Sequence, residues 1–419
     1  MTTLLLSHRA SLDHLTPPGH PERPDRIRAV EEVLANGQFG ALVREQAPEG
    51  SLDQVALCHD GHYIDELHHI SPKDGIVYLD GDTSMSPGTW EAAMRGVGGA
   101  GAATDAVISG KHNHPSAPPP PPGHHAEPNN PRGFCFFNNA AIAARHAQRK
   151  HGIARAAVVD FDVHHGNGTQ EIFWADPTVM YCSTHQMPLF PGTGAMRERG
   201  EHDNIVNAPL ASEDGSAKFR AAFENLILPQ LTKFSPELII ISAGFDAHFR
   251  DPLASLNLRA DDFGWVTRKL MDLADSTAGG RVVSVLEGGY DLAGGGFVRL
   301  VDVSRALRAR PPPIPRRWAR LIPPPQYPRK APVDSMPGAS ETYDMAENTQ
   351  ADVKKLTFER ALEELETIVK RLEEGKVPLE ESVAIYERGE ALKQRCEELL
   401  RQAEARVEKI TVDSAGKAR

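Results

Sequence analysis

The feature that most constrains the fold is a short stretch near the middle of the chain, where an apolar run gives way to polar side chains at alternate positions. Residues 158–159 are β-branched and apolar, which is typical of a buried strand, and residues 166–168 read Gly-Asn-Gly, which is typical of a turn. Asp160, Asp162 and His164 lie between them, and their alternate spacing places their side chains on one face of a strand. Two carboxylates and an imidazole are suitable ligands for zinc or another late divalent ion.

Two later stretches repeat this pattern. Residues 238–241 are aliphatic and lead to Asp246, and residues 282–286 lead to Glu287 and Tyr290. Strand-like and helical segments alternate along the chain, which predicts an α/β fold with a parallel sheet, and such sheets bind ligands at the carboxyl ends of their strands. Asp246 is therefore the expected third metal ligand. Three protein ligands leave a coordination position open, as in catalytic zinc sites.

Composition narrows the class of protein. The chain has 419 residues and a formal net charge of -11, so it is long enough for two or three domains and is not an obvious general nucleic-acid binder. Its four cysteines include no CxxC pair, which argues against a disulfide framework or a thiolate zinc site. The N-terminus lacks the features of a signal peptide, and no apolar run reaches the ~18 residues of a membrane span, which predicts a cytoplasmic protein without membrane contact.

Periodicity and turn residues predict the flanking elements. A first strand is expected at residues 4–7. Helices are expected at residues 25–34, 89–108, 219–231 and 261–275, and an alanine-rich helix is expected to end near residue 150. Asp82 lies in a loop from which it can reach the rim of the site.

Two adjacent histidines, His124 and His125, follow a run of prolines and a glycine. Histidines in such a loop are usually solvated, so the pair alone carries little information. In a chain that also carries a metal site, a histidine general base beside a metal-activated water is a standard hydrolytic arrangement. The combination predicts a metal-assisted hydrolase.

Five ordered motifs then identify a family, and they cover residues 122–125, 133–139, 160–168, 243–246 and 287–290. Together they resemble the histone deacetylase and acetylpolyamine amidohydrolase superfamily over residues 1–295, and Asn167 resembles its class II branch. The resemblance implies the parallel-sheet arginase/deacetylase fold. It also implies zinc-dependent hydrolysis of acetyl-lysine or a similar acyl amide.

The resemblance implies a role for each residue that matches a motif. The expected zinc ligands are Asp162, His164 and Asp246. The expected catalytic residues are His124, His125, Tyr290, Asp160 and Asn167. Among these, His125 is the general base and acid, and Tyr290 hydrogen-bonds the amide oxygen. Asp160 orients His124, and Asn167 orients His125. A potassium ion is implied beside the zinc site, with the ligands Asp160, Asp162, His164 and Ser183.

The substrate tunnel is expected to be lined by Gly133, Phe134, Phe190 and Leu253. Members of the family that select polyamines carry an acidic gatekeeper shortly after the third zinc ligand. Leu253 stands at about that position here, which favours an acetylated lysine protein or peptide as substrate. Asp251 lies close by in sequence and keeps an acetylated polyamine as the alternative substrate.

Two stretches depart from the family's pattern. Residues 111–122 form a proline run where the family has a strand-like segment. After Tyr290, an Arg/Pro-rich stretch replaces the usual closing helix, and so many prolines exclude a helix. The sequence therefore predicts a deacetylase domain over residues 1–308 and a disordered linker over residues 309–350.

Residues 351–419 differ completely in character. Apolar residues recur at helical spacing on both sides of a break at Gly375 and Pro378, with charged residues between them. This pattern predicts an antiparallel helical hairpin with coiled-coil character that needs a partner to bury its apolar stripe. From pattern alone, a generic charged hairpin is the alternative. From about residue 345, the tail resembles the small subunit of bacterial exodeoxyribonuclease VII, which implies binding to the large subunit and only indirect contact with single-stranded DNA.

Two hypotheses for the working function of this fusion follow. In the first, residues 1–295 act as a deacetylase and the tail binds its nuclease partner. In the second, the proline stretches disable the front module. The chain then works only as the small exonuclease subunit, which degrades single-stranded DNA to nucleotides together with a large subunit.

Overall fold

The computed structural model describes residues 3–112, 115–117 and 121–292, together with Thr357, Arg360, Glu364, Arg388 and Leu392. The chain divides into two compact units, residues 1–314 and 315–419. The predicted linker at residues 309–350 lies outside the described residues, and so do most of the tail and the segment that would follow Tyr290 as a closing helix.

The first unit is built on an eight-stranded, all-parallel sheet, which confirms the predicted α/β fold. The strand order is β2-β1-β5-β10-β9-β6-β7-β8. The strands are β1 (Leu4–Ser7), β2 (Val43–Gln46), β5 (Ser116–Ala117), β6 (Ala156–Asp160), β7 (Val179–Gln186), β8 (Ile205–Leu210), β9 (Leu238–Ala243) and β10 (Val282–Leu286). A small antiparallel pair is formed by β3 (Val77–Tyr78) and β4 (Ser84–Met85).

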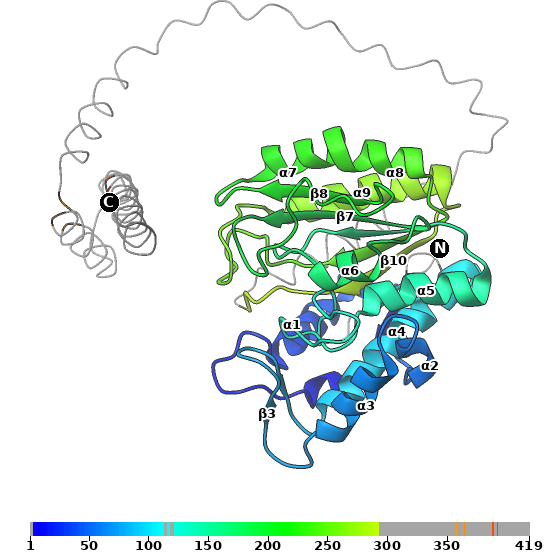
Figure 1. Cartoon of the computed structure of the whole chain (residues 1–419), viewed down its shortest axis with the longest axis vertical. Coiled ribbons are helices and arrows are strands. Elements are labelled where there is room, and N and C mark those ends of the chain that lie inside the picture. The colour runs from blue at the N-terminus through cyan, green and yellow to red at the C-terminus, as the bar shows by residue number, and fades with distance from the viewer. Residues whose placement is uncertain are drawn as a thin grey trace, which may run out of the picture. The chain divides into compact units, whose positions relative to one another are not determined.

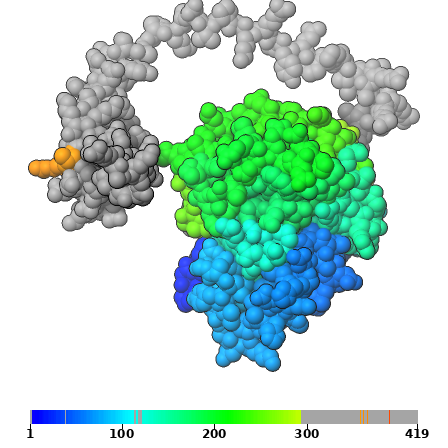
Figure 2. Space-filling view, viewed as in Figure 1, coloured from blue at the N-terminus to red at the C-terminus, as the bar shows by residue number. Residues whose placement is uncertain are grey.

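Helices cover both faces of this sheet, with α4 and α5 on one side and α7, α8 and α9 on the other (Figure 1). The helices are α1 (Asp25–Leu34), α2 (Leu52–Val55), α3 (Gly61–Ile70), α4 (Thr89–Ile108), α5 (Asn139–His151), α6 (Asn167–Ile172), α7 (Ser216–Ala222), α8 (Leu228–Phe234) and α9 (Ala260–Thr277). The helix expected at residues 219–231 is α7 and α8, joined by a π turn at Phe223–Ile227. Residues up to about 110 gather at one end of the visible surface of the first unit, and the described residues from about 150 to 292 gather at the other (Figure 2).

The sheet has a core on each face because the side chains of a strand alternate. In β9, Leu238 and Ile240 pack on the side of α4 and α5, whereas Ile239 and Ile241 pack on the side of α9. All four side chains are almost fully buried, and each such burial contributes roughly 1.5–3 kcal/mol. The unbroken aliphatic run of β9 is therefore a consequence of two covered faces.

Strand β5 corrects one expectation from the sequence. The proline run at residues 111–122 was expected to lack the family's strand, yet Ser116 and Ala117 pair in parallel between β1 and β10. Pro115 contributes as well, because its carbonyl accepts a hydrogen bond of 3.1 Å from the backbone N–H of Ser284. Proline lacks only the donor, so prolines that flank a two-residue strand do not prevent its pairing.

The strand order places β10, β9 and β6 side by side. Their registers align the last residues, with Asp160 of β6 opposite Ser242 of β9, and Ala243 of β9 opposite Leu286 of β10. The polar residues that follow each strand therefore meet at one edge of the sheet, as the sequence predicted. Within the described ranges, no helix is long and apolar enough to cross a membrane.

Candidate active site

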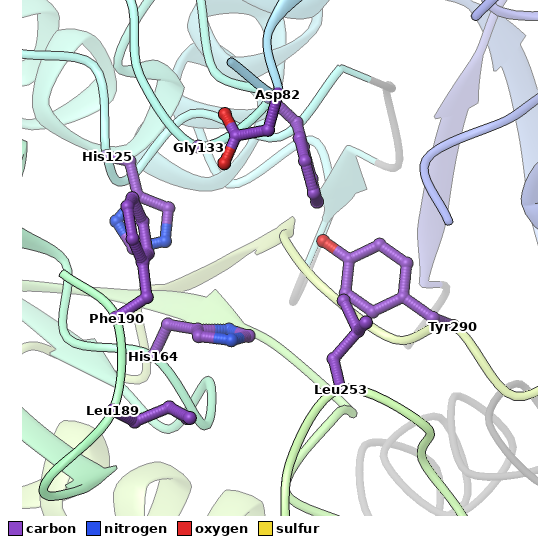
Figure 3. A pocket seen from close by; sticks show the side chains of 9 residues that line it. Asp82, His125, Gly133, His164, Leu189, Phe190, Leu253 and Tyr290 are labelled. Atoms are coloured by element: carbon purple, nitrogen blue, oxygen red, sulfur yellow. The ribbon is translucent and has the colours of Figure 1, made fainter. Parts of the chain in front are cut away.

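A pocket of about 210 Å³ opens at this edge of the sheet. It is lined by Asp82, His125, Gly133, Phe134, His164, Leu189, Phe190, Leu253 and Tyr290. The imidazoles of His125 and His164 and the hydroxyl of Tyr290 border a common space (Figure 3). The volume is below the ~300–1,000 Å³ typical of small-molecule sites, so the pocket has room for one slender chain.

The three predicted metal ligands, Asp162, His164 and Asp246, lie together, with one ligand atom from each within 4.8 Å of the others, and His164 lines the pocket. The Nδ1 atom of His164 lies 3.2 Å from a carboxylate oxygen of Asp162 and 3.2 Å from one of Asp246. Neighbouring ligands around a tetrahedral zinc, with bonds of about 2.0–2.1 Å, are separated by roughly 3.3 Å. The donor set therefore fits a zinc ion in both chemistry and spacing.

The electrostatics of this cluster also favour a cation. The side chains of Asp162 and Asp246 are almost fully buried. Burial and the neighbouring Asp162 carboxylate raise the pKa of Asp246 to about 7. Two buried carboxylates that repel each other in this way are stabilised by a divalent ion between them.

Backbone donors and two glycines hold the carboxylates in place. The N–H of Gly288 donates to Asp162 (2.8 Å), and the N–H of Val163 donates to Asp246 (2.9 Å). A Cβ atom on Gly244 would lie 2.1 Å from an oxygen of Asp162, and one on Gly288 would lie 2.2 Å from an oxygen of Asp246. The glycines that follow β9 and β10 are therefore required by the close approach of the carboxylates.

The two histidines of the pair occupy different electrostatic environments. The Nδ1 atom of His124 lies 3.0 Å from Asp160, and that of His125 lies 2.8 Å from the Oδ1 atom of Asn167. Burial alone lowers the pKa of His124, but the Asp160 and Asp162 carboxylates raise it to about 10. Burial, and then the charge of His124, hold the pKa of His125 well below its usual range.

Asn167 determines which nitrogen of His125 carries the proton. Its amide nitrogen donates to Glu127 (2.6 Å) and to the carbonyl of His125 (3.4 Å), which leaves Oδ1 as the acceptor. The neutral imidazole therefore donates from Nδ1, and its Nε2 atom is left as a proton acceptor. This is the protonation state that a general base requires.

Tyr290 lies across the pocket from the histidines, and three contacts hold it. Its backbone N–H donates to Asp251 (2.7 Å), the Arg26 guanidinium lies 4.6 Å from its ring centre, and its ring meets that of Phe134 edge-on at 6.0 Å. Burial raises the pKa of Tyr290 well above its usual range. The phenol therefore stays protonated and can donate a hydrogen bond.

The structure brings all four expected tunnel residues into the pocket wall, namely Gly133, Phe134, Phe190 and Leu253. Gly133 has a φ of +56°, and a Cβ atom there would lie 2.6 Å from the ring of His125. The ring of Phe190 lies edge-on to that of His125, 5.0 Å away. Glycine at position 133 thus allows the wall to close directly against the histidine.

Ser183, the remaining expected potassium ligand, lies opposite Asp160 in the pairing of β6 and β7 and is fully buried. Its hydroxyl lies 2.9 Å from the Nδ1 atom of His185. The assignment of Asp160, Asp162, His164 and Ser183 to potassium stays a prediction.

Sequence reasoning gave no role to the side chain of Glu287, which joins three parts of the site. Its carboxylate accepts hydrogen bonds from the backbone N–H groups of Gly123 (2.7 Å) and His124 (3.1 Å) and from the hydroxyl of Ser242 (2.8 Å). Burial raises the pKa of Glu287 to about 7. The sequence signal that could have indicated its role is the position of an acidic residue directly after a buried strand.

A second cluster, Asp105, His146 and His151, lies between α4 and α5 and was not foreseen. Both imidazole Nε2 atoms approach one oxygen of Asp105, at 2.8 and 2.6 Å, and Lys150 approaches the other oxygen at 2.7 Å. Partial burial raises the pKa of Asp105, but hydrogen bonds from Lys150 and the histidines lower it to about 2. The carboxylate is thus already matched by hydrogen-bond donors, and the spacings are too short for a zinc coordination shell.

Comparison with known proteins gives two matches to family models. The model of the histone deacetylase domain matches residues 20–297, and the model of the exonuclease VII small subunit matches residues 358–409. A probable deacetylase of Archaeoglobus fulgidus is 38% identical over 300 residues, covering 70% of this chain and 83% of the relative. A histone deacetylase-like amidohydrolase of Pseudomonas aeruginosa is 39% identical over 281 residues, covering 66% and 73%.

A solved structure shares the fold. The crystal structure of the HDA15 HD domain superposes with a TM-score of 0.69 at 34% sequence identity, and the match covers 73% of this chain and 88% of that one.

Proposed function

The chain belongs to the histone deacetylase family, and on that premise we propose that residues 1–308 form a zinc-dependent deacetylase that hydrolyses acetyl-lysine. The observation that carries the proposal is the convergence of three chemistries on one narrow pocket. His164 from a zinc-type donor set, the neutral His125 with a free Nε2 atom, and the protonated Tyr290 all line it. A metal ion that polarises the carbonyl, a general base and an oxyanion donor together suit metal-assisted amide hydrolysis.

Zinc held by Asp162, His164 and Asp246 would polarise the amide carbonyl and lower the pKa of a water molecule. The Nε2 atom of His125 accepts the proton of that water as it attacks the carbonyl carbon. Asn167 stabilises the resulting imidazolium through its bond to Nδ1–H. The hydroxyl of Tyr290 donates a hydrogen bond to the oxyanion.

The C–N bond then breaks, and the imidazolium returns the proton to the leaving lysine amine, so that acetate and a free lysine are released. His124 contributes a fixed positive charge beside this reaction, because Asp160 and Asp162 stabilise its protonated form. Phe190 and Gly133 pack against the ring of His125 and limit its contact with bulk solvent.

The pocket wall supports acetyl-lysine over an acetylated polyamine. Leu253 contributes an apolar surface to the pocket. Asp251, the residue that kept the polyamine alternative open, is buried, and both of its oxygens accept hydrogen bonds from backbone N–H groups. It therefore presents no free carboxylate to a cationic substrate. Among the described lining residues, the carboxylate that could contact a cationic substrate is therefore that of Asp82, not that of Asp251.

For the tail we propose that residues 351–419 form a helical hairpin that binds the large subunit of exonuclease VII. The family-model match over residues 358–409 supports this proposal. Glu364 and Arg388 are both helical and form an ion pair at 2.8 Å, although 24 residues separate them. Leu392, on the same expected helix as Arg388, is fully buried. These contacts are consistent with two antiparallel helices that share an apolar seam.

The proposed deacetylase is tested by acetate release from an acetyl-lysine peptide with the purified full chain. We expect Tyr290→Phe to lower kcat by roughly 10²–10³, the effect of removing one oxyanion donor, with bound zinc unchanged. Tyr78→Phe is the matched control, because it removes a phenol that is 63% exposed. Zinc-loaded chain that releases acetate from an acetylated polyamine but not from the peptide would favour the alternative substrate. Zinc-loaded chain that releases none from either would refute the proposal.

A further inference from the structure

One buried carboxylate joins the loop of the third metal ligand to the loop of the tyrosine. Asp251 follows Asp246 by five residues and is 6% exposed. One of its oxygens accepts a hydrogen bond from the backbone N–H of Tyr290 (2.7 Å), and the other accepts one from the backbone N–H of Leu253 (3.1 Å). The side chain therefore binds the backbone of two residues that line the pocket.

The bond to Tyr290 completes a set of hydrogen bonds that hold the segment before it. The N–H of Gly288 donates to Asp162 (2.8 Å), and the guanidinium of Arg26 donates to the carbonyl of Gly289 (2.8 Å). Gly289 has a φ of +131°, a region open mainly to glycine, so the turn into the tyrosine requires this residue. The short, charge-assisted hydrogen bond to Asp251 is the one that holds the N–H of Tyr290 itself. The stack against Arg26 then fixes the ring.

The bond to Leu253 has a different consequence. Leu253 lines the pocket, and its backbone N–H is held by the same carboxylate that holds Tyr290. The apolar wall and the hydroxyl donor therefore have a common anchor. A shift of the Asp251 carboxylate displaces both at once.

We propose that Asp251 is a positioning residue that places the Tyr290 hydroxyl for transition-state stabilisation and holds the Leu253 wall for substrate binding. This inference rests on the deacetylase activity proposed above. It predicts two separable effects of one side chain, one on kcat through Tyr290 and one on KM through Leu253.

Asp251→Asn is the variant of choice because it keeps the shape of the side chain. The amide oxygen of the variant can still accept one hydrogen bond. The amide NH₂ group cannot accept the other, so the N–H of either Tyr290 or Leu253 loses its partner. We expect kcat for the acetyl-lysine peptide to fall about 100-fold, the scale of an ångström-sized misplacement of a catalytic group, and KM to rise. Leu253→Ala should raise KM with kcat within about twofold of wild type.

A double-mutant cycle with Tyr290→Phe distinguishes positioning from general damage. Once the hydroxyl is gone, its position no longer matters. Asp251→Asn should therefore lower kcat of the Tyr290→Phe chain by less than about threefold while still raising KM. Independent effects would multiply, so a further 100-fold loss of kcat in the double variant would overturn the proposal. So would an unchanged kcat in Asp251→Asn alone.

Arg250→Ala is the matched control. Arg250 pairs with Asp291 at 3.3 Å and ties the same two loops without contacting the backbone N–H of Tyr290. Its guanidinium is partly exposed, and such pairs are worth ~0–1 kcal/mol. We expect kcat to change by less than about threefold. A 100-fold loss there would mean that any tie between the loops suffices, which contradicts the specific role of Asp251.

Amide hydrogen exchange of the unmodified full chain tests the anchor without activity or a variant. The Tyr290 amide should exchange slowly, and Asp251→Asn should speed its exchange while Arg250→Ala does not. Fast exchange of this amide in the wild-type chain would overturn the proposal even if the enzyme is active. Slow exchange of this amide in a chain with no deacetylase activity would instead support the Asp251–Tyr290 hydrogen bond and refute the proposed reaction.

Discussion

Mild acid is expected to destabilise the first unit, and His59 is one of the buried histidines that contribute. Its Nδ1 atom donates to the carbonyl of Glu127 (2.9 Å), and its Nε2 atom accepts from the backbone N–H of Asn138 (2.9 Å). One ring nitrogen donates and the other accepts, so both hydrogen bonds require the neutral imidazole. Asn138 in turn contacts the backbone carbonyls of His124 and Ala126, so the histidine supports the loop of the active-site pair.

The sign and the size of the effect follow from the pKa. Burial lowers the pKa of His59 from its usual value near 6.5 to about 4. At pH 8 neither the folded nor the unfolded chain is protonated at this residue. Below pH 6.5, His59 binds a proton in the unfolded chain but not in the folded chain. Its contribution to the free energy of unfolding therefore falls until the pH nears 4. The full contribution of His59 is about 3 kcal/mol, and about 2 kcal/mol of it is lost between pH 8 and pH 5.

The measurement is the free energy of unfolding in urea at pH 8 and pH 5, followed by tryptophan fluorescence. Trp90 reports on this region, because its ring lies 5.7 Å from that of Phe137, which in turn packs against His59. His59→Gln keeps an acceptor for Asn138 but cannot titrate, so its loss of stability between the two pH values should be about 2 kcal/mol smaller than that of wild type. His62→Gln, at an exposed position of α3, is the control.

The reasoning is refuted if wild type and His59→Gln lose the same free energy between pH 8 and pH 5. At pH 8 the variant should be less stable by about 1 kcal/mol, because its bond to Glu127 is gone. That offset is independent of pH and does not affect the comparison.

Three further predictions concern packing, specificity and the tail. Gly168→Ala should lower the free energy of unfolding by about 1–3 kcal/mol and abolish activity, because its Cβ atom would lie 2.1 Å from the Ala126 carbonyl oxygen. Gly61 has open space around it, so Gly61→Ala is the control and should unfold like wild type in the same urea melts. Leu253→Glu should raise kcat/KM for an acetylated polyamine relative to the peptide by up to about fivefold, and a wild-type ratio would argue against this wall as the selector. Leu392→Asp should abolish co-purification of the full chain with an exonuclease VII large subunit, and retained binding would exclude a role for the buried seam.

The sequence predicted the parts of the site that are local in the chain. Asp160, Asp162 and His164 could be found because one strand and the turn after it carry them at alternate positions. Asp246 and Tyr290 could be found because aliphatic strands end just before them, and parallel strands meet at a common edge. Helix α4 and strand β1 were predicted with the boundaries that the structure has.

The sequence could not predict roles that depend on contacts between distant segments. Asp251 and Glu287 act through single side chains that bond to the backbone of other loops, and such contacts leave no periodic signal. Strand β5 was missed because prolines suggest a break, although a two-residue strand needs only Ser116 and Ala117 as donors. The cluster around Asp105 was missed because α4 and α5 bring its members together.

We propose that a zinc ion at Asp162, His164 and Asp246 drives hydrolysis of acetyl-lysine. It is tested most directly by stripping the full chain with a chelator, restoring zinc stepwise, and measuring bound zinc and acetate release from an acetyl-lysine peptide in the same samples. We predict that acetate release disappears with the metal, returns in proportion to zinc up to one ion per chain, and is not restored in Asp246→Ala. Acetate release that persists in metal-free chain, or none from chain that holds one zinc ion, would contradict the account.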